Sequence, residues 1–181
     1  MTPRIPAVFE RLDALEWQLC QRLAKTGSQR RYLMVLRVAS RLGDWPLWVA
    51  LILAQPLWHG PAGWQLSVHF TLSALVAIGI YRLIKTRACR ERPSITYRTI
   101  PCTTAARDRY SFPSGHTLHA VMFSLFTAAT APMVLIVILP LACLIAMSRV
   151  GLGLHYISDV IGGAMLGATL AIVALTWLPA I

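Results

Sequence analysis

Apolar residues in this chain gather in long runs, and the polar residues between those runs form short inserts. The runs cover residues 31–58, 64–84, 115–130, 132–147 and 156–178. A membrane-spanning helix needs about 20 apolar residues, so the third and fourth runs are short for that purpose. The pattern predicts an all-α fold, an integral membrane helical bundle of about five transmembrane helices.

The segment before the first run, residues 7–25, shows a helical period instead of a continuous run. Its apolar positions are Val8, Leu12, Leu15, Leu19 and Leu23. Polar side chains fill positions between them: Glu10, Arg11, Asp13, Gln18 and Arg22. This predicts an N-terminal amphipathic interfacial helix that lies on the membrane. We expect one membrane-embedded domain over 1–181, with the amphipathic segment at 1–28 and a helical core at 30–178.

Two further details bear on the helices. The stretch 43–46, Gly-Asp-Trp-Pro, interrupts the first run and is expected to kink or divide it, with Asp44 as a helix-break or cap residue. In the last run, Gly163 and Gly167 have the spacing that allows two helices to pack closely.

The composition supports a membrane protein. Hydrophobic residues make up 56% and charged residues 13% of the chain, whereas a soluble domain carries about 25% charged residues. The net charge of +10 is typical of proteins that bind nucleic acid or anionic lipid surfaces. No nucleic-acid-binding motif accompanies this charge, so we expect the lipid bilayer, and no nucleic acid, as a partner.

Residues 85–113 form a long polar loop. Five of its arginines are expected in solvent or against lipid headgroups: Arg87, Arg90, Arg98, Arg107 and Arg109. Cys89 and Cys102 share this loop and could form a disulfide if it faces an oxidising compartment, a pairing that sequence alone leaves open.

Three polar stretches adjoin the ends of apolar runs: KTRACRERP at 85–93, FPSGHTLH at 112–119 and SRVGLGLHYISD at 148–159. Counting the crossings places all three on one membrane face. Ionisable residues are costly at such positions, so the three stretches together predict a functional site.

The expected site combines cations with a helix N-terminus. Lys85, Arg92 and Arg149 would repel one another unless an anion is bound between them. Ser114 follows a proline and is suited to cap a helix whose free N–H groups, including that of Gly115, favour an anion. Ammonium, guanidinium and helix N-terminus together predict a phosphate site.

The same stretches contain acid–base groups. His155 and Asp159 are four residues apart, so a helix that begins near 154 would let the carboxylate orient the imidazole as a base or nucleophile. His116 is suited to acid catalysis near neutral pH. His119 lies one turn further on, and we interpret it as a supporting or structural residue.

A metal site is not expected. Only Asp159 among the seven acidic residues belongs to the cluster, whereas magnesium requires several oxygen ligands. Zinc could take His116, His119 and His155, but three nearby cations disfavour it. The residues therefore predict metal-free phosphoryl transfer with no cofactor.

The motifs K-x6-RP, PSGH and SR-x5-H-x3-D, with every position filled, resemble the three-part signature of the type 2 phosphatidic acid phosphatase family. That family includes membrane lipid phosphatases, glucose-6-phosphatase and soluble vanadium haloperoxidases. The resemblance implies that His155 is the nucleophile of a phosphohistidine intermediate and that Asp159 holds its imidazole. It further implies that His116 protonates the leaving oxygen. The groups that would hold the phosphoryl oxygens are Lys85, Arg92, Ser114, the Gly115 N–H and Arg149.

The implied activity is hydrolysis of a lipid phosphate or diphosphate. Undecaprenyl diphosphate and lipids of the phosphatidylglycerophosphate or phosphatidic acid type are the first candidates for the substrate. A lipid phosphotransferase that uses the same histidine and a non-catalytic phospholipid-binding or flipping protein are the alternatives. The apolar runs argue against a soluble haloperoxidase. The oligomeric state is left open.

The resemblance implies a multi-pass protein of the bacterial inner membrane whose active site faces the periplasm. The positive-inside rule implies the opposite orientation, because the cations lie on the site face.

Overall fold

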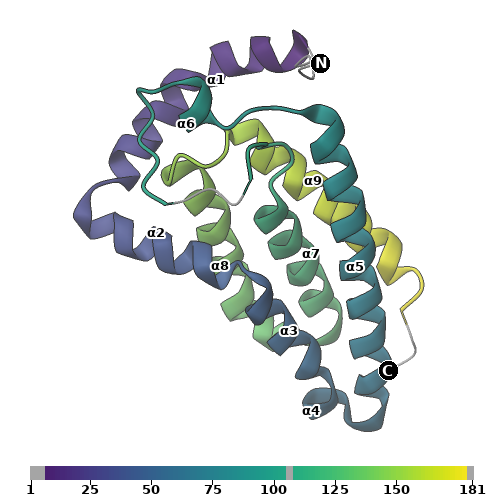
Figure 1. Ribbon diagram of the computed structural model, residues 1–181. Coiled ribbons are helices and arrows are strands. Elements are labelled where there is room, and N and C mark those ends of the chain that lie inside the picture. Colours follow the sequence, from purple (N-terminus) through teal and green to yellow (C-terminus); the bar gives the residue numbers. More distant parts are fainter. Residues whose placement is uncertain (1–6, 105–107, 179–181) are drawn as a thin grey trace.

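The computed structural model describes residues 7–104 and 108–178, and the regular structure in these ranges is helical apart from one isolated bridge between Glu91 and Tyr110. Figure 1 shows an elongated bundle with α1 lying across the end that also holds the 89–114 loop. The helices are α1 (Ala7–Gly27), α2 (Arg30–Leu42), α3 (Trp45–Leu53), α4 (Gln55–His59), the 3-10 helix η1 (Gly60–Ala62), α5 (Gly63–Ala88), α6 (Pro93–Thr96), α7 (Gly115–Thr130), α8 (Pro132–Gly151) and α9 (Ile157–Leu175). The expected all-α class is confirmed.

Three described helical stretches are long and apolar enough to cross a membrane: Trp45–Ala88, Pro132–Gly151 and Ile157–Leu175. The first has 44 residues because it runs from α3 through α4 and η1 into α5. The chain reverses at Gly60, whose φ of 56° suits a residue without a Cβ, so that α3 and α5 form a hairpin (Figure 1). The expected number of about five spans stays a prediction.

The stretch that interrupts the first apolar run divides it. Helix α2 ends at Leu42 and α3 begins at Trp45, with Gly43 and Asp44 between them. The chain changes direction at this point (Figure 1), and α2 packs against α8 instead of continuing the line of α3. One of the two outcomes expected from the sequence, division of the run, is thus confirmed.

Helix α7 forms the centre of the bundle, because it packs against α5, α8 and α9. Its aromatic side chains join the neighbouring helices to it. Phe126 stacks on Phe70 of α5 with ring centroids 4.3 Å apart, and Phe123 stacks on Trp48 of α3 at 5.0 Å. All four rings are buried, so both arms of the α3–α5 hairpin are packed against α7.

Helix α1 spans the expected residues, but its faces are arranged differently from a soluble amphipathic helix. Leu15 is 79% and Leu19 50% exposed, whereas Asp13 is buried with Cys20 and Ala24 against the protein. An apolar stripe that faces outward suits a helix at a lipid interface. The sequence placed Asp13 on the polar face but did not indicate that this face is the buried one.

Two glycines permit close contact between α7 and α9. A Cβ built on Gly163 would lie 2.5 Å from the Ser114 carbonyl oxygen, and one on Gly167 would lie 2.3 Å from the Leu118 carbonyl oxygen. Both distances are shorter than any Cβ contact that a folded protein tolerates. The spacing therefore serves close packing of α9 on α7, as expected.

We predict that Gly167→Ala lowers the free energy of unfolding by about 1–3 kcal/mol, because the backbone of α7 must move to admit a methyl group. Gly79→Ala is the matched control, since Gly79 is an exposed helical residue with no atom within 4 Å of a built Cβ. Thermal unfolding in detergent measures both. Equal melting temperatures for the two variants would contradict the packing argument.

Candidate active site

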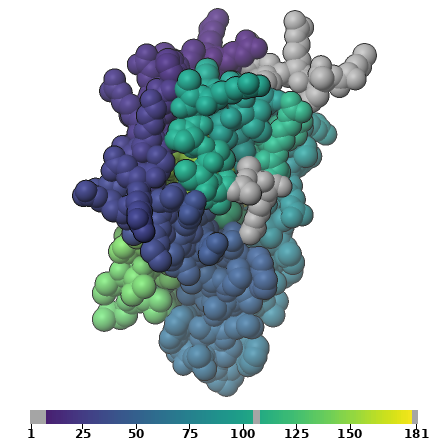
Figure 2. All heavy atoms as spheres, turned by 60° about the vertical axis from the view of Figure 1, so that its left-hand side comes forward, coloured from purple at the N-terminus to yellow at the C-terminus, as the bar shows by residue number. Residues whose placement is uncertain are grey.

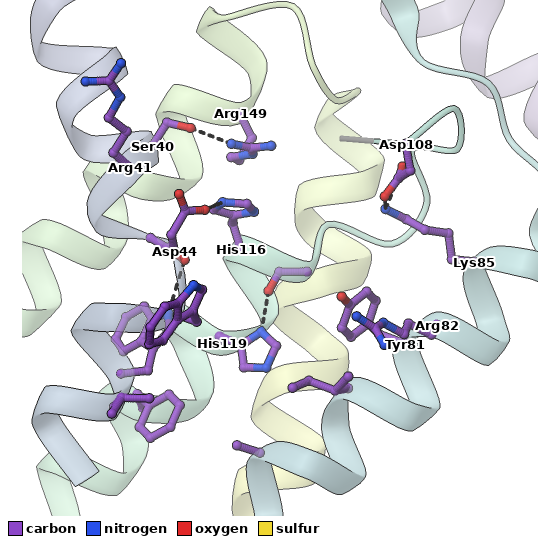
Figure 3. Close-up of a pocket in the computed structure, with 18 of the residues that line it drawn as sticks. Ser40, Arg41, Asp44, Tyr81, Arg82, Lys85, Asp108, His116, His119 and Arg149 are labelled. Carbon is purple, nitrogen blue, oxygen red and sulfur yellow. Dashed lines mark hydrogen bonds and ion pairs between the residues drawn. The ribbon is translucent and has the colours of Figure 1, made fainter. Parts of the chain in front are cut away.

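The three polar stretches meet at one end of the bundle. Each contributes side chains to the wall of one cavity of about 730 Å³ that lies between α3, α5, α7 and the end of α8 (Figure 3). The sequence-predicted residues in that wall are Lys85, Arg92, Gly115, His116, Arg149 and His155. Helix ends position them: Lys85 lies in the last turn of α5, His116 in the first turn of α7 and Arg149 in the last turn of α8.

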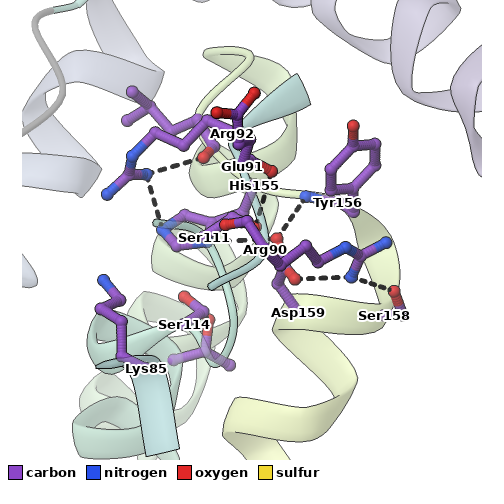
Figure 4. A network of polar contacts seen from close by, with 12 residues as sticks. Lys85, Arg90, Glu91, Arg92, Ser111, Ser114, His155, Tyr156, Ser158 and Asp159 are labelled. Carbon is purple, nitrogen blue, oxygen red and sulfur yellow. Dashed lines mark hydrogen bonds and ion pairs between the residues drawn. The ribbon is translucent and has the colours of Figure 1, made fainter. Parts of the chain in front are cut away.

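His155 is buried at the base of this cavity, 2% exposed. Its Nε2 atom lies 3.2 Å from Nη1 of Arg92. A guanidinium can only donate, so Nε2 accepts and the ring proton sits on Nδ1, which lies 3.5 Å from Oδ2 of Asp159. The lone pair of His155 thus points toward the cationic wall, and the carboxylate lies behind the ring (Figure 4).

His155 lies beside Asp159 as expected, although helix α9 begins at a different residue. Helix α9 begins at Ile157, later than the start near 154 from which the pairing was argued. Asp159 lies in the first turn instead, where its Oδ2 accepts the N–H of Tyr156 at 2.8 Å. This cap turns the carboxylate back toward the residue that precedes the helix.

Burial, reinforced by the nearby charge of Arg149, holds the pKa of the His155 imidazole well below its ordinary value. Both effects disfavour the charged form of the ring. His155 is therefore neutral near pH 7, which is the form that can act as a nucleophile.

The cations of the cavity are paired with groups that the sequence did not indicate. Nζ of Lys85 lies 3.0 Å from a carboxylate oxygen of Asp108, and Nη2 of Arg92 lies 2.9 Å from the other. Burial alone would raise the pKa of the Asp108 carboxyl, but Lys85 and Arg92 hold it below its ordinary value. Nη1 of Arg149 donates to Ser40 of α2 at 2.6 Å. Neither partner has a motif spacing that could have identified it.

Ser114 occupies the N-cap position of α7, as expected. Its side chain is fully buried and lies 3.0 Å from the hydroxyl of Thr117, while its backbone N–H donates to the Asp159 carbonyl oxygen. The Ser114 hydroxyl would therefore have to exchange a partner to hold a phosphoryl oxygen. The bond to Asp159 fastens the start of α7 to the start of α9.

His116 is held by a residue from outside the three stretches. Its Nε2 lies 2.8 Å from Oδ1 of Asp44 (Figure 3). Asp44 occupies the N-cap position of α3, but its side chain makes no capping hydrogen bond. Its interpretation as only a break or cap residue is therefore too narrow. The available signal was an acidic residue placed between apolar segments.

His119 lies in the cavity wall one turn beyond His116, and its Nδ1 donates to the Gly115 carbonyl oxygen at 2.8 Å. This contact fits the supporting role that the sequence suggested.

The expectation that Arg90 is solvated is wrong. Its guanidinium is fully buried and contacts Asp159 at 2.6 Å and Ser158 at 2.7 Å (Figure 4). It also contacts Asp13 at 2.7 Å. Carboxylates on both sides compensate the cost of burying this charge. Of the other four arginines, Arg87, Arg98 and Arg109 are exposed as expected, and Arg107 lies outside the described residues.

The two loop cysteines are not bonded to each other. Both are free thiols, and each donates to a nearby carbonyl: Cys89 to Thr86 and Cys102 to Thr104. The disulfide that the sequence left open is therefore absent from this structure.

Within residues 7–104 and 108–178, no group of three or more His, Cys, Asp or Glu side chains is arranged to hold a metal ion. Lys85 and Arg92 contact both oxygens of Asp108, and the polar end of the cavity wall carries the hydrogen-bond donors of Lys85, Arg92 and Arg149. Such donors are complementary to phosphoryl oxygens.

Comparison with known families decides how this arrangement is classified. The model of the PAP2 superfamily matches residues 66–181, which is more than half of the chain. The chain belongs to the PAP2 superfamily. The resemblance drawn from the three motifs is thereby confirmed, and the family match includes all of the sequence-predicted site residues.

Two curated relatives are decaprenylphosphoryl-5-phosphoribose phosphatases from two strains of Mycobacterium tuberculosis, each 36% identical over 98 residues. The alignment covers 53% of this chain and 52% of each relative. The chain thus spans about half the length of the curated relatives it matches.

Two crystal structures share the PAP2 fold over nearly the whole chain. A transmembrane PAP2-type phosphatidylglycerolphosphate phosphatase from Bacillus subtilis gives a TM-score of 0.71 at 22% identity, over 94% of this chain and 92% of that one. LpxE from Aquifex aeolicus gives 0.68 at 20% identity, over 90% and 95%. The similarity supports a helical membrane protein, in agreement with the candidate spans.

Proposed function

We propose that this PAP2 protein is a metal-independent lipid phosphatase that acts through a phosphohistidine at His155. One observation carries the proposal: a buried, neutral imidazole directs its lone pair into a cation-lined cavity while a carboxylate lies behind it. That arrangement is suited to nucleophilic attack on a phosphorus atom whose oxygens are held by cations.

The first chemical step forms one bond and breaks another. Nε2 of His155 bonds to phosphorus, and the bond from phosphorus to the lipid oxygen breaks. The leaving oxygen takes a proton from His116. Lys85, Arg92 and Arg149 stabilise the charge on the phosphoryl oxygens during the transfer.

The second step restores the enzyme. Water attacks the phosphohistidine and gives a proton to His116, the P–N bond breaks, and inorganic phosphate leaves. His155 recovers its lone pair, with its proton still on Nδ1 facing Asp159. The cycle begins and ends with His116 protonated, so no external acid, base or metal ion is consumed.

Asp44 gives His116 the acid role in this scheme. An imidazolium has two N–H donors, and the one on Nε2 is taken by Asp44 at 2.8 Å. In the proposed scheme, the proton for the leaving oxygen comes from this ring. A carboxylate at this distance also stabilises the charged form of the ring, which an acid catalyst requires.

The shape of the cavity supports a lipid substrate. From the polar end it continues between α3 and α5, within the candidate span Trp45–Ala88. The apolar residues in this part of its wall include Trp48, Val49, Ile52, Leu75, Ile78 and Phe123. A phosphate at headgroup depth can reach His155 while the attached chain occupies this apolar part.

The substrate class we propose is a lipid phosphate monoester or diphosphate on a polyprenyl or diacylglycerol chain. Undecaprenyl diphosphate and phosphatidylglycerophosphate or phosphatidic acid lipids belong to it. A polyprenyl-linked sugar phosphate, as in the name of the mycobacterial relatives, belongs to it as well.

We predict that His155→Ala lowers the rate of phosphate release from such lipids at least about a thousandfold. The assay is run in detergent with EDTA present. His59→Ala at the far end of the bundle is the control and keeps full activity. Because the pKa of His155 is lowered, its neutral form persists below the ordinary value of about 6.5. Phosphohistidine formation should therefore not slow between pH 8 and 6.5 through protonation of this ring. Unchanged release by His155→Ala would leave a lipid-binding protein as the better interpretation.

We further predict that Asp44→Asn affects substrates according to their leaving group. Turnover of a lipid phosphate, whose alkoxide needs a proton, should fall about 10²-fold or more. Turnover of p-nitrophenyl phosphate, whose phenolate leaves without one, should fall much less. Equal losses on the two substrates would show that Asp44 shapes the cavity without acting on His116.

We propose that the site faces the periplasm of a bacterial inner membrane. Three of the cations that would favour a cytoplasmic loop, Lys85, Arg90 and Arg92, are held in ion pairs within the site. They therefore carry little information about topology.

Cys102 provides the test of orientation, because it is an exposed free thiol on the site side. A membrane-impermeant maleimide should label it in spheroplasts with an intact inner membrane. Cys102→Ser should lose this label. Labelling that requires permeabilised inner membranes would place the site in the cytoplasm.

A further inference from the structure

Arg90 joins three parts of the chain that are distant in sequence. Its Nη1 donates to Oδ1 of Asp159 at 2.6 Å, and its Nε and Nη2 donate to Oδ1 of Asp13 at 3.0 and 2.7 Å. The guanidinium lies over the ring of Tyr156, 4.1 Å from its centroid. Its position is thus fixed by Asp13 of α1 and by the start of α9. Figure 4 shows the contacts with Asp159 and Ser158.

Helix α1 makes further contacts at the same place. Glu16 accepts the backbone N–H of Ser158, in the first turn of α9, at 2.9 Å. The ring of Phe9 lies against both Arg90 and Phe112, the latter at a centroid distance of 5.2 Å. In Figure 2, α1 in purple lies directly against the teal loop segment at this end of the molecule.

Both oxygens of the Asp159 carboxylate are held, and the Ser111 side chain also hydrogen-bonds to this group. Arg90 binds Oδ1, and the Tyr156 N–H binds Oδ2, the oxygen that faces Nδ1 of His155. Asp159 is fully buried, and Arg90 is the charged group that contacts it and helps to set its rotation. A continuous path therefore runs from Asp13 through Arg90 and Asp159 to His155.

We propose that Asp13 of α1 is a positioning residue, which holds Arg90 against Asp159 and thereby orients the imidazole of His155. The N-terminal helix would then be part of the catalytic apparatus as well as a membrane-surface element. This rests on the proposed function of His155. The family match begins at residue 66, so it does not include α1.

Membrane attachment alone does not account for the acidic residues of α1 that are buried against Arg90. The outward face of α1 is apolar and suffices to hold the helix at a lipid interface. Carboxylates buried against a buried arginine contribute little net stability compared with apolar residues of similar volume. Their geometry does, however, give the Asp159 carboxylate a single orientation.

The decisive variant is Asp13→Asn, which keeps the shape of the side chain and removes its charge. The matched control is Glu10→Gln on the exposed side of the same helix. With a lipid phosphate that the wild type hydrolyses, we expect kcat of Asp13→Asn to fall about tenfold, because the nucleophile loses its alignment. KM should stay within about twofold, because Lys85, Arg92 and Arg149 are untouched. Glu10→Gln should match the wild type.

A double variant separates positioning from general stability. If Asp13 acts through Asp159, then Asp13→Asn should cause no further loss of kcat in an Asp159→Asn background. Arg90→Lys, whose single ammonium cannot contact both carboxylates as the guanidinium does, should also lower kcat with KM unchanged. Melting temperatures in detergent establish that each variant is folded.

Three outcomes distinguish the possibilities. A reduced melting temperature with unchanged kcat in Asp13→Asn would make α1 purely structural and overturn the inference. Losses that multiply in the double variant would overturn it too. A wild type that releases no phosphate from any lipid would defeat the proposed function itself, and this inference with it.

Discussion

Charges that are buried at the edge of a membrane must be compensated by other charges, and this constraint organises the whole site. Two networks satisfy it. Lys85 and Arg92 share the carboxylate of Asp108, whose side chain is 46% exposed. Arg90 is bound by Asp13 and Asp159 and is fully buried. In the proposed mechanism the first network exchanges its partially exposed carboxylate for a phosphoryl group, while the second is enclosed and keeps its geometry.

The residues of the three motifs could be identified from sequence because their positions depend on local structure. Lys85, His116 and Arg149 each lie in a terminal turn of a helix, so the end of an apolar run was sufficient to place them on one face. The partners of these residues could not be found in this way. Asp44 is 72 positions from His116, and Asp13 is 77 positions from Arg90. Such pairings depend on how helices are rotated and packed, which no local spacing records.

The sequence also did not show which way the apolar face of α1 points. The period of α1 predicted a helix with one apolar side, and the structure contains that helix. In water the apolar side would face the protein, whereas at a lipid interface it faces outward, as Leu15 and Leu19 do. The polar side then packs inward, which is why Asp13 and Arg90 are buried. The same ambiguity led to the expectation that Arg90 is solvated.

The contact between α7 and α9 determines which parts of the protein can accept substitutions without moving the two histidines. Gly163 and Gly167 bring the two helices together, and the bond from Ser114 to Asp159 joins their starts. The histidine at the start of α7 and the one just before α9 are thus mounted on a single pair of helices. The apolar walls of the cavity come largely from α3 and α5. Under the proposed function, substitutions along that hairpin would alter which lipid tail is accommodated without disturbing the reacting groups, so one chemical centre could serve many membrane lipids.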